Sequence, residues 1–69
     1  MDITVKQLSG RFIAEVRLNG YTTASAEDLT DVAALNRLKQ TLLTDPTSDP
    51  HAAEMVDQKI GMLHAAARL

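Results

Sequence analysis

The sequence predicts a single small α+β domain in which a three-stranded antiparallel β-meander is followed by two α-helices, a βββαα order. Three observations support this. The first 23 residues alternate between apolar and polar side chains with a period of two, and two glycine-containing dipeptides divide them. Two later segments place apolar residues three and four positions apart. The chain has 69 residues, which is enough for one domain, 1–69.

Residues 2–8 and 11–18 form the first predicted hairpin, with Ser9-Gly10 as its two-residue turn. Folding the chain about this turn places Val5 opposite Ala14 and Ile3 opposite Val16, so the apolar side chains collect on one face. On the other face Thr4 lies opposite Glu15. Asp2 lies opposite Arg17 on that face and forms a candidate charge pair with it.

Asn19-Gly20 predicts a second hairpin, since both residues tolerate the positive φ angles of a type I′ turn. We expect a short third strand, Tyr21 to Thr23, with Leu18 opposite Tyr21 and Val16 opposite Thr23. The predicted meander therefore occupies residues 1–23.

The first helix is predicted over residues 25–44. Ser25 is a suitable N-cap, and acidic residues follow in the first two turns, where the helix dipole favours them. The apolar stripe of this helix should cover the sheet; it consists of Val32, Leu35, Leu38 and Leu42.

Residues 45–49 form a predicted link with two Asp-Pro steps, and a second helix should occupy residues 50–68. Asp49 as N-cap and Pro50 as first helical residue are typical of a helix start. This helix carries two adjacent apolar rows: Val56, Ile60 and Leu63 in one, and Met55, Met62, Ala66 and Leu69 in the other. One of the two rows can pack on the first helix and the sheet, but the two rows together favour contact with a partner.

Charge and composition argue against several functions. The formal net charge is −2 and no concentrated basic stripe is visible, so binding to nucleic acid or to an anionic membrane is not favoured. No apolar stretch approaches 18 residues, and the first four residues do not resemble a signal peptide. Because cysteine is also absent, we expect a cytoplasmic protein.

Catalytic and metal-binding patterns are weak. His51 and His64 are 13 positions apart, too far along one helix to share a metal ion. The series His51, Glu54, Asp57 drifts around the helix and is better explained as a solvated face. The chain has no cysteine nucleophile and no phosphate-binding glycine motif. We therefore expect no enzyme activity, no metal and no cofactor.

The leading functional hypothesis is a non-catalytic protein–protein interaction module, a regulator, inhibitor or adaptor of a larger partner that also associates with itself. Ten alanines and only two aromatic residues give a thin core, and a small monomer has too little surface to cover both rows of the last helix. No small-molecule substrate is evident. The predicted contact residues are Met55, Val56, Lys59, Met62, Leu63, Ala66 and Leu69.

The alternative hypothesis is nucleic-acid binding through the exposed sheet face. Residues 10–17 and 23–29 resemble the sheet-to-helix passage of AP2-type and integrase arm-binding domains. That resemblance implies phosphate contacts by Lys6, Arg11 and Arg17, although a tryptophan in the second strand is missing here. The same strand order is similar to HicB-type antitoxins, and residues 46–50 resemble the interhelical turn of type III secretion needle subunits. We assign the chain to none of these families.

Overall fold

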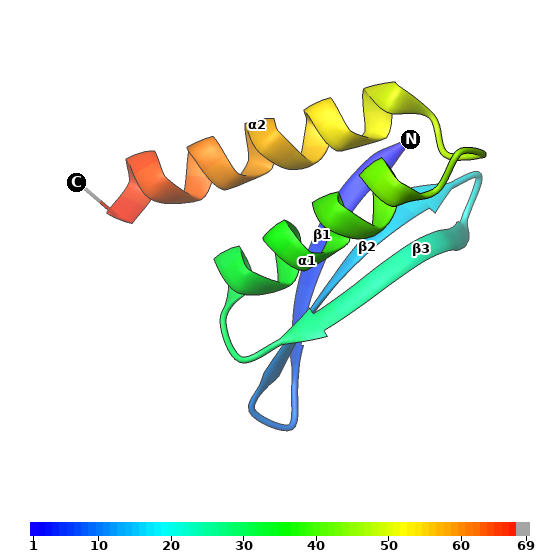
Figure 1. Cartoon of the computed structure of the whole chain (residues 1–69). Coiled ribbons are helices and arrows are strands. Elements are labelled where there is room, and N and C mark those ends of the chain that lie inside the picture. Colours follow the sequence, from blue (N-terminus) through cyan, green and yellow to red (C-terminus); the bar gives the residue numbers. More distant parts are fainter. Residues whose placement is uncertain (68–69) are drawn as a thin grey trace.

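The computed structural model describes residues 1–67 and confirms the βββαα α+β fold. Strands β1 (Asp2–Leu8), β2 (Arg11–Leu18) and β3 (Tyr21–Asp28) form an open antiparallel sheet in the order β1-β2-β3. Helices α1 (Asp31–Thr44) and α2 (Pro50–Ala67) lie on one face of this sheet (Figure 1). Helix α1 packs over β2 and β3, whereas α2 packs against α1 and β1.

The β1–β2 register agrees with the sequence prediction. Ile3 pairs with Val16, Val5 with Ala14, and Thr4 with Glu15. Both turns have the left-handed backbone that their glycines allow, with φ of +78° at Gly10 and +83° at Gly20. Asp2 also pairs in register with Arg17, but within residues 1–67 the two side chains form no ion pair.

Strand β3 is longer than the sequence predicted, and its register differs. Leu18 pairs with Tyr21 as expected, but Val16 pairs with Ala24 and not with Thr23, because a register shift between Val16 and Arg17 leaves Thr23 without a partner residue. This bulge changes which side chains point towards the helices. Ala24 and Ala26 consequently lie opposite Val16 and Ala14 on the packed face, and the strand continues to Asp28.

Helix α1 begins at Asp31, so the predicted start at residue 25 with Ser25 as N-cap is wrong. The N-cap is Thr30, whose hydroxyl accepts a hydrogen bond of 3.1 Å from the backbone N–H of Ala33. Residues 25–28 remain in the sheet because their backbones pair with β2 as far as Phe12.

The link and the start of α2 agree with the prediction. The Asp49 carboxylate accepts a hydrogen bond of 2.9 Å from the N–H of His51, and Pro50 is the first helical residue. The Ser48 hydroxyl donates to the carbonyl of Leu42, which satisfies an acceptor at the end of α1. The structure describes α2 as far as Ala67, so the predicted end at residue 68 lies outside the described residues.

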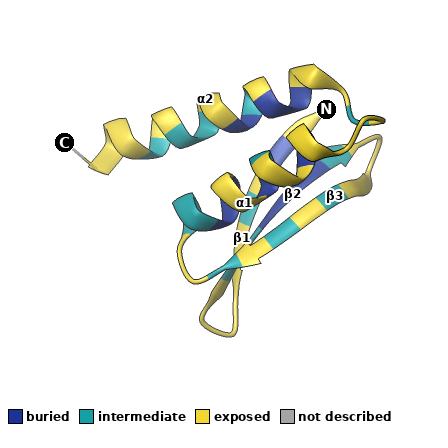
Figure 2. Ribbon diagram, in the orientation of Figure 1, coloured by how far each residue is buried: buried dark blue, intermediate teal, exposed yellow. Residues whose placement is uncertain are grey.

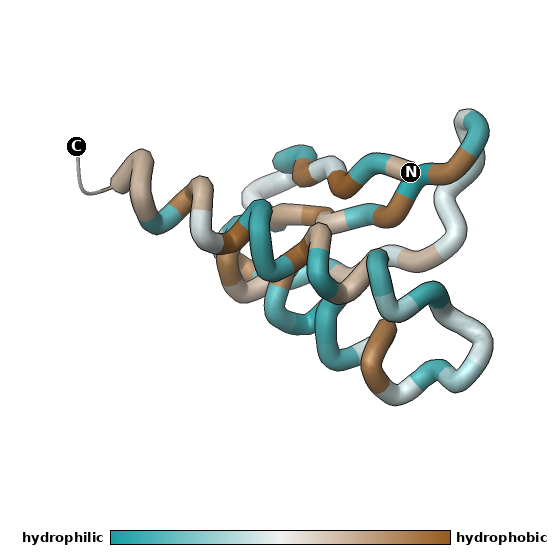
Figure 3. Tube along the Cα trace, turned by 90° about the horizontal axis from the view of Figure 1, so that it is seen from above, coloured by the Kyte–Doolittle hydropathy of each residue, from teal (hydrophilic) through white to brown (hydrophobic). Residues whose placement is uncertain are grey.

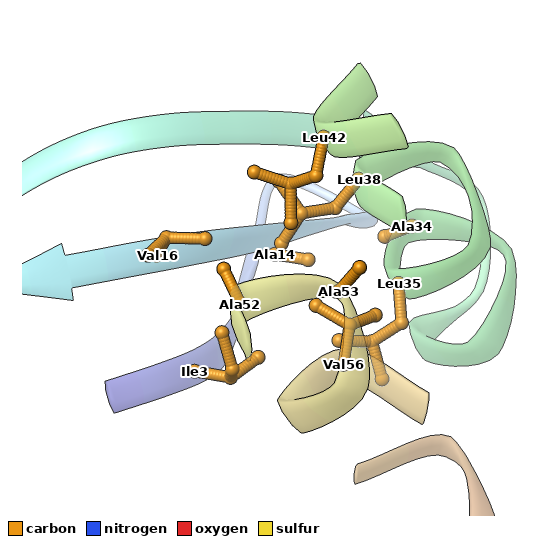
Figure 4. Close-up of a cluster of buried hydrophobic side chains, with 10 residues drawn as sticks. All are labelled: Ile3, Ala14, Val16, Ala34, Leu35, Leu38, Leu42, Ala52, Ala53 and Val56. Atoms are coloured by element: carbon orange, nitrogen blue, oxygen red, sulfur yellow. The ribbon is translucent and has the colours of Figure 1, made fainter. Parts of the chain in front are cut away.

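The core lies between the sheet and the two helices (Figure 4). Each layer contributes small or medium side chains, and the largest fully buried ones are Leu35, Leu38, Val16 and Val56. Burial is concentrated where α1 and α2 approach each other, whereas the C-terminal half of α2 is largely exposed (Figure 2). The ten buried apolar residues are Ile3, Ala14, Val16, Ala34, Leu35, Leu38, Leu42, Ala52, Ala53 and Val56.

Candidate protein-contact surface

The two apolar rows of α2 have different surroundings. Val56 is fully buried, and Ile60 and Leu63 are half-buried against the core. In the second row Met55 is half-buried, while Met62 is 66% exposed and Ala66 is exposed. Towards its C-terminal end α2 extends beyond the sheet and α1, and its last turns are moderately hydrophobic (Figure 3).

The described residues of the second row, Met55, Met62 and Ala66, lie on the side of α2 that faces away from α1. Lys39 of α1 forms an ion pair of 2.8 Å with Asp57 of α2, so Asp57 marks the side that faces α1. Asp57 and Met62 are five residues apart, which separates them by about 140° around the helix. We call the side opposite Asp57 the outer flank of α2; it consists of Met55, Lys59, Met62 and Ala66.

The structure therefore divides the predicted contact residues. Val56 is enclosed in the core and has no surface for a partner. Leu63 is half-buried and lines a hollow with Lys59. Met55, Lys59, Met62 and Ala66 lie together on the outer flank, and Leu69 lies outside the described residues.

Other exposed large apolar side chains do not continue this surface. Leu29 precedes α1, Leu43 lies in its last turn, and Tyr21 follows the β2–β3 turn. Leu29 and Leu43 lie near opposite ends of α1, whereas Tyr21 lies opposite Leu18, which is also exposed (45%), in the β2–β3 hairpin. Scattered exposed apolar side chains of this kind are normal for a protein surface.

The helix-free face of the sheet carries the cations of the nucleic-acid hypothesis, and each of them lies beside a carboxylate. The Nζ atom of Lys6 is 2.9 Å from Glu15, and Arg17 lies 3.8 Å from the same carboxylate. Arg11 pairs with Glu27 at 2.9 Å. The charges of Asp2, Glu15 and Glu27 thus balance those of the three cations on this face, which weighs against an electrostatic phosphate-binding surface.

Glu15 is the centre of this face, and its role was not apparent from the sequence. No helix covers it, yet only 6% of its surface is exposed because neighbouring side chains enclose it. The Thr22 hydroxyl donates a hydrogen bond of 2.6 Å to the carboxylate. The hydrogen bond from Thr22, that from Lys6 and the two nearby cations lower the pKa of Glu15.

The series of acidic and histidine side chains on α2 does not converge. The Nδ1 atom of His51 lies 3.5 Å from Glu54, whereas Asp57 turns to Lys39. Over residues 1–67 no group of three or more metal-ligating side chains comes together. Over the same residues no helix is both long and apolar enough to cross a membrane.

Among the hollows at the surface of residues 1–67, two have volumes of about 350 and about 340 Å³. The first lies beside the α1–α2 link, and the carboxylates of Asp45 and Asp49 that line it accept hydrogen bonds from the link and the start of α2. Asp49 caps α2, and Asp45 accepts hydrogen bonds from the hydroxyl and the N–H of Thr47, which lower its pKa. The second lies between α2 and the β1–β2 hairpin, and its apolar lining residues are Val5, Phe12 and Leu63.

Comparisons of the chain with protein-family profiles, with curated proteins and with solved structures found no match.

Proposed function

We propose that this protein is a non-catalytic protein–protein interaction module that acts as a regulator, inhibitor or adaptor and associates through the outer flank of α2. One observation carries the proposal: Met62 is 66% exposed on a helix that extends beyond its own domain. Methionine adapts to varied partner shapes, and Ala66 one turn later allows close approach. The proposal includes a cytoplasmic location, which the absence of cysteine favours.

The flank has the composition of an interface core with a polar margin. Met55, Met62 and Ala66 are apolar, and the stem of Lys59 can lie along them while its ammonium group stays in water. Full burial of an exposed methionine side chain stabilises by about 1.5–3 kcal/mol, and Met62, which is 66% exposed, can contribute the larger part of that on contact with a partner. The surface is therefore suited to one compact helix-mediated contact.

A matched pair of substitutions tests this function. Met62→Lys places a charge on the outer flank, and Leu29→Lys places the same charge at a site of similar exposure, 68%, before α1. The tagged full chain should retain partner protein from native lysate, and Met62→Lys should lose it while Leu29→Lys keeps it. Circular dichroism should show that both variants fold. Equal retention by both variants, or by neither, would refute a contact through the outer flank.

A further inference from the structure

The free edge of β1, the strand beside α2, is complementary in charge and in apolar side chains to the same edge of a second copy of the chain. β1 is a terminal strand of the sheet, so one of its two edges has no partner strand within residues 1–67. An unpaired strand of this length offers backbone donors and acceptors to another strand. Natural edge strands usually carry a feature that prevents such pairing, and on β1 the candidate is Lys6.

In one antiparallel register, that lysine becomes an attractive contact. If two copies of β1 pair about a two-fold axis at Thr4, Asp2 of each copy lies opposite Lys6 of the other. On the packed face the same register places Ile3 opposite Val5 of the second copy. A register centred on Val5 would instead place Asp2 opposite Leu8 and Ile3 opposite Gln7. Charge and hydrophobic complementarity therefore both select the register centred on Thr4.

Both charged groups are accessible for this contact. Asp2 is exposed and forms no ion pair within the described part of the chain. The side chain of Lys6 is 60% exposed even though it contacts Glu15. Its ammonium group has three N–H donors, so it can bind Glu15 and an incoming carboxylate together.

The same pairing would cover the outer flank of α2. Since α2 packs over β1 and its Asp57 side faces α1, the outer flank looks outward past the free edge of β1. A two-fold axis at that edge brings the two outer flanks towards each other above the joined sheet. Met62 of each copy then gains an apolar neighbour, and the second copy covers the surface that the proposed function uses.

The opposite edge of the sheet lacks these features. In β3 the bulge at Thr23 interrupts the ladder of hydrogen bonds. The α1 residues on that side include Arg37 and Thr41, which are exposed and polar. Arg37 is also engaged with Asp28 of β3 at 3.2 Å.

We infer that this protein forms a two-fold symmetric homodimer in which two β1 strands pair antiparallel about Thr4, giving a continuous six-stranded sheet with the two α2 helices packed across the seam. The inference rests on the proposed function because it assigns the outer flank of α2 to a second copy of the chain. It also adds a strand edge and a register that the proposed function does not require.

Cross-linking tests the register directly, because the native chain has no cysteine. In the Thr4→Cys variant the two introduced thiols meet at the axis, where the Cα atoms of paired residues are about 4.5–5.5 Å apart and a disulfide can form. The control is Ser25→Cys, which is also exposed on the helix-free face but on β3. Under mild oxidation at low protein concentration, Thr4→Cys should become covalent dimer and Ser25→Cys should remain monomer.

Association of the purified chain provides the second measurement, by sedimentation over a wide range of concentrations. The wild type should be a dimer, and Asp2→Lys should weaken the dimer about tenfold, because two Asp–Lys contacts become Lys–Lys contacts. A chain that stays monomeric throughout would overturn the inference, as would a dimer that Ser25→Cys cross-links and Thr4→Cys does not. If the monomeric chain still retains a Met62-dependent partner from lysate, the proposed function survives and only the homodimer fails.

Discussion

At the scale of single residues, Glu15 shows how a polar sheet face can be ordered without a covering layer. The register places this carboxylate on the central strand, between Lys6 on one side and Thr22 on the other. Arg17 donates a hydrogen bond of 3.1 Å to Thr22, which in turn donates to Glu15. These contacts favour the ionised carboxylate, so its pKa in the folded state is below the ordinary value of 4.5.

This shift predicts a loss of stability in acid. A carboxylate whose pKa is lower in the folded state stabilises the fold above its unfolded pKa, and this contribution disappears as the pH falls through the folded pKa. Asp28, whose pKa is lowered by the backbone N–H of Leu29 and by Arg37, acts in the same direction. The free energy of unfolding, measured with urea at a series of pH values, should therefore decrease below about pH 4.5. Glu15→Gln should be less stable at neutral pH and show a shallower decrease, and a slope unchanged from the wild type would contradict this role.

The core allows a matched test of burial on a single helix. Leu38 is fully buried and Leu43 is 59% exposed, and both belong to α1. Leu38→Ala should reduce the free energy of unfolding by about 2–5 kcal/mol, because it removes buried methyl groups and leaves a cavity. Leu43→Ala should change it by about 0.5 kcal/mol or less. Similar losses in the two variants would mean that the helix does not bury the face described.

At the scale of elements, the sequence predicted all five in order, and the errors are confined to one segment. Period-two alternation and the Asn19-Gly20 turn located β3, but a regular ladder would have turned Thr23 and Ser25 towards the core. The bulge at Thr23 shifts the alternation of side chains by one residue, so Ala24 and Ala26 point towards α1 instead. No local residue pattern distinguishes such a bulge from the end of a strand. The sequence predicts a capped helix start from Ser25 and the acidic residues Glu27 and Asp28. In the structure these three residues pair with β2.

The position of the helix cap can be tested by two alanine substitutions. Thr30→Ala removes the hydroxyl that accepts from Ala33 and leaves that N–H without its side-chain partner, so it should cost about 1 kcal/mol of unfolding free energy. Ser25→Ala, at the cap expected from the sequence, should have a much smaller effect because Ser25 lies in a strand. Chemical denaturation of both variants measures the difference. A larger loss for Ser25→Ala would support a helix that begins near residue 25.

At the scale of the whole molecule, the sequence predicted that the last helix carries more apolar surface than the domain covers, but not which side of it stays exposed. Helical spacing separated the two rows, whereas the direction of each row depends on how α2 sits against α1 and β1. That orientation depends on tertiary contacts: Ala52, Ala53 and Val56 of α2 are buried in the core, and Asp57 forms an ion pair with Lys39 of α1, 18 positions earlier. The strand order β1-β2-β3, which within residues 1–67 leaves one edge of β1 without a partner strand, agrees with the meander that the sequence predicted.

The homodimer predicts that thermal stability depends on protein concentration. Association that involves only the folded state shifts the unfolding equilibrium by mass action, so the melting temperature of the wild type should rise as the chain is concentrated. Met62→Lys should weaken this dependence because it places a charge at the seam between the two α2 helices, whereas Leu29→Lys should retain it. Circular dichroism melts at several concentrations measure all three proteins. A wild-type melting temperature that stays constant over the range in which sedimentation shows dimer would mean that the paired strands and helices add nothing to the stability of the fold.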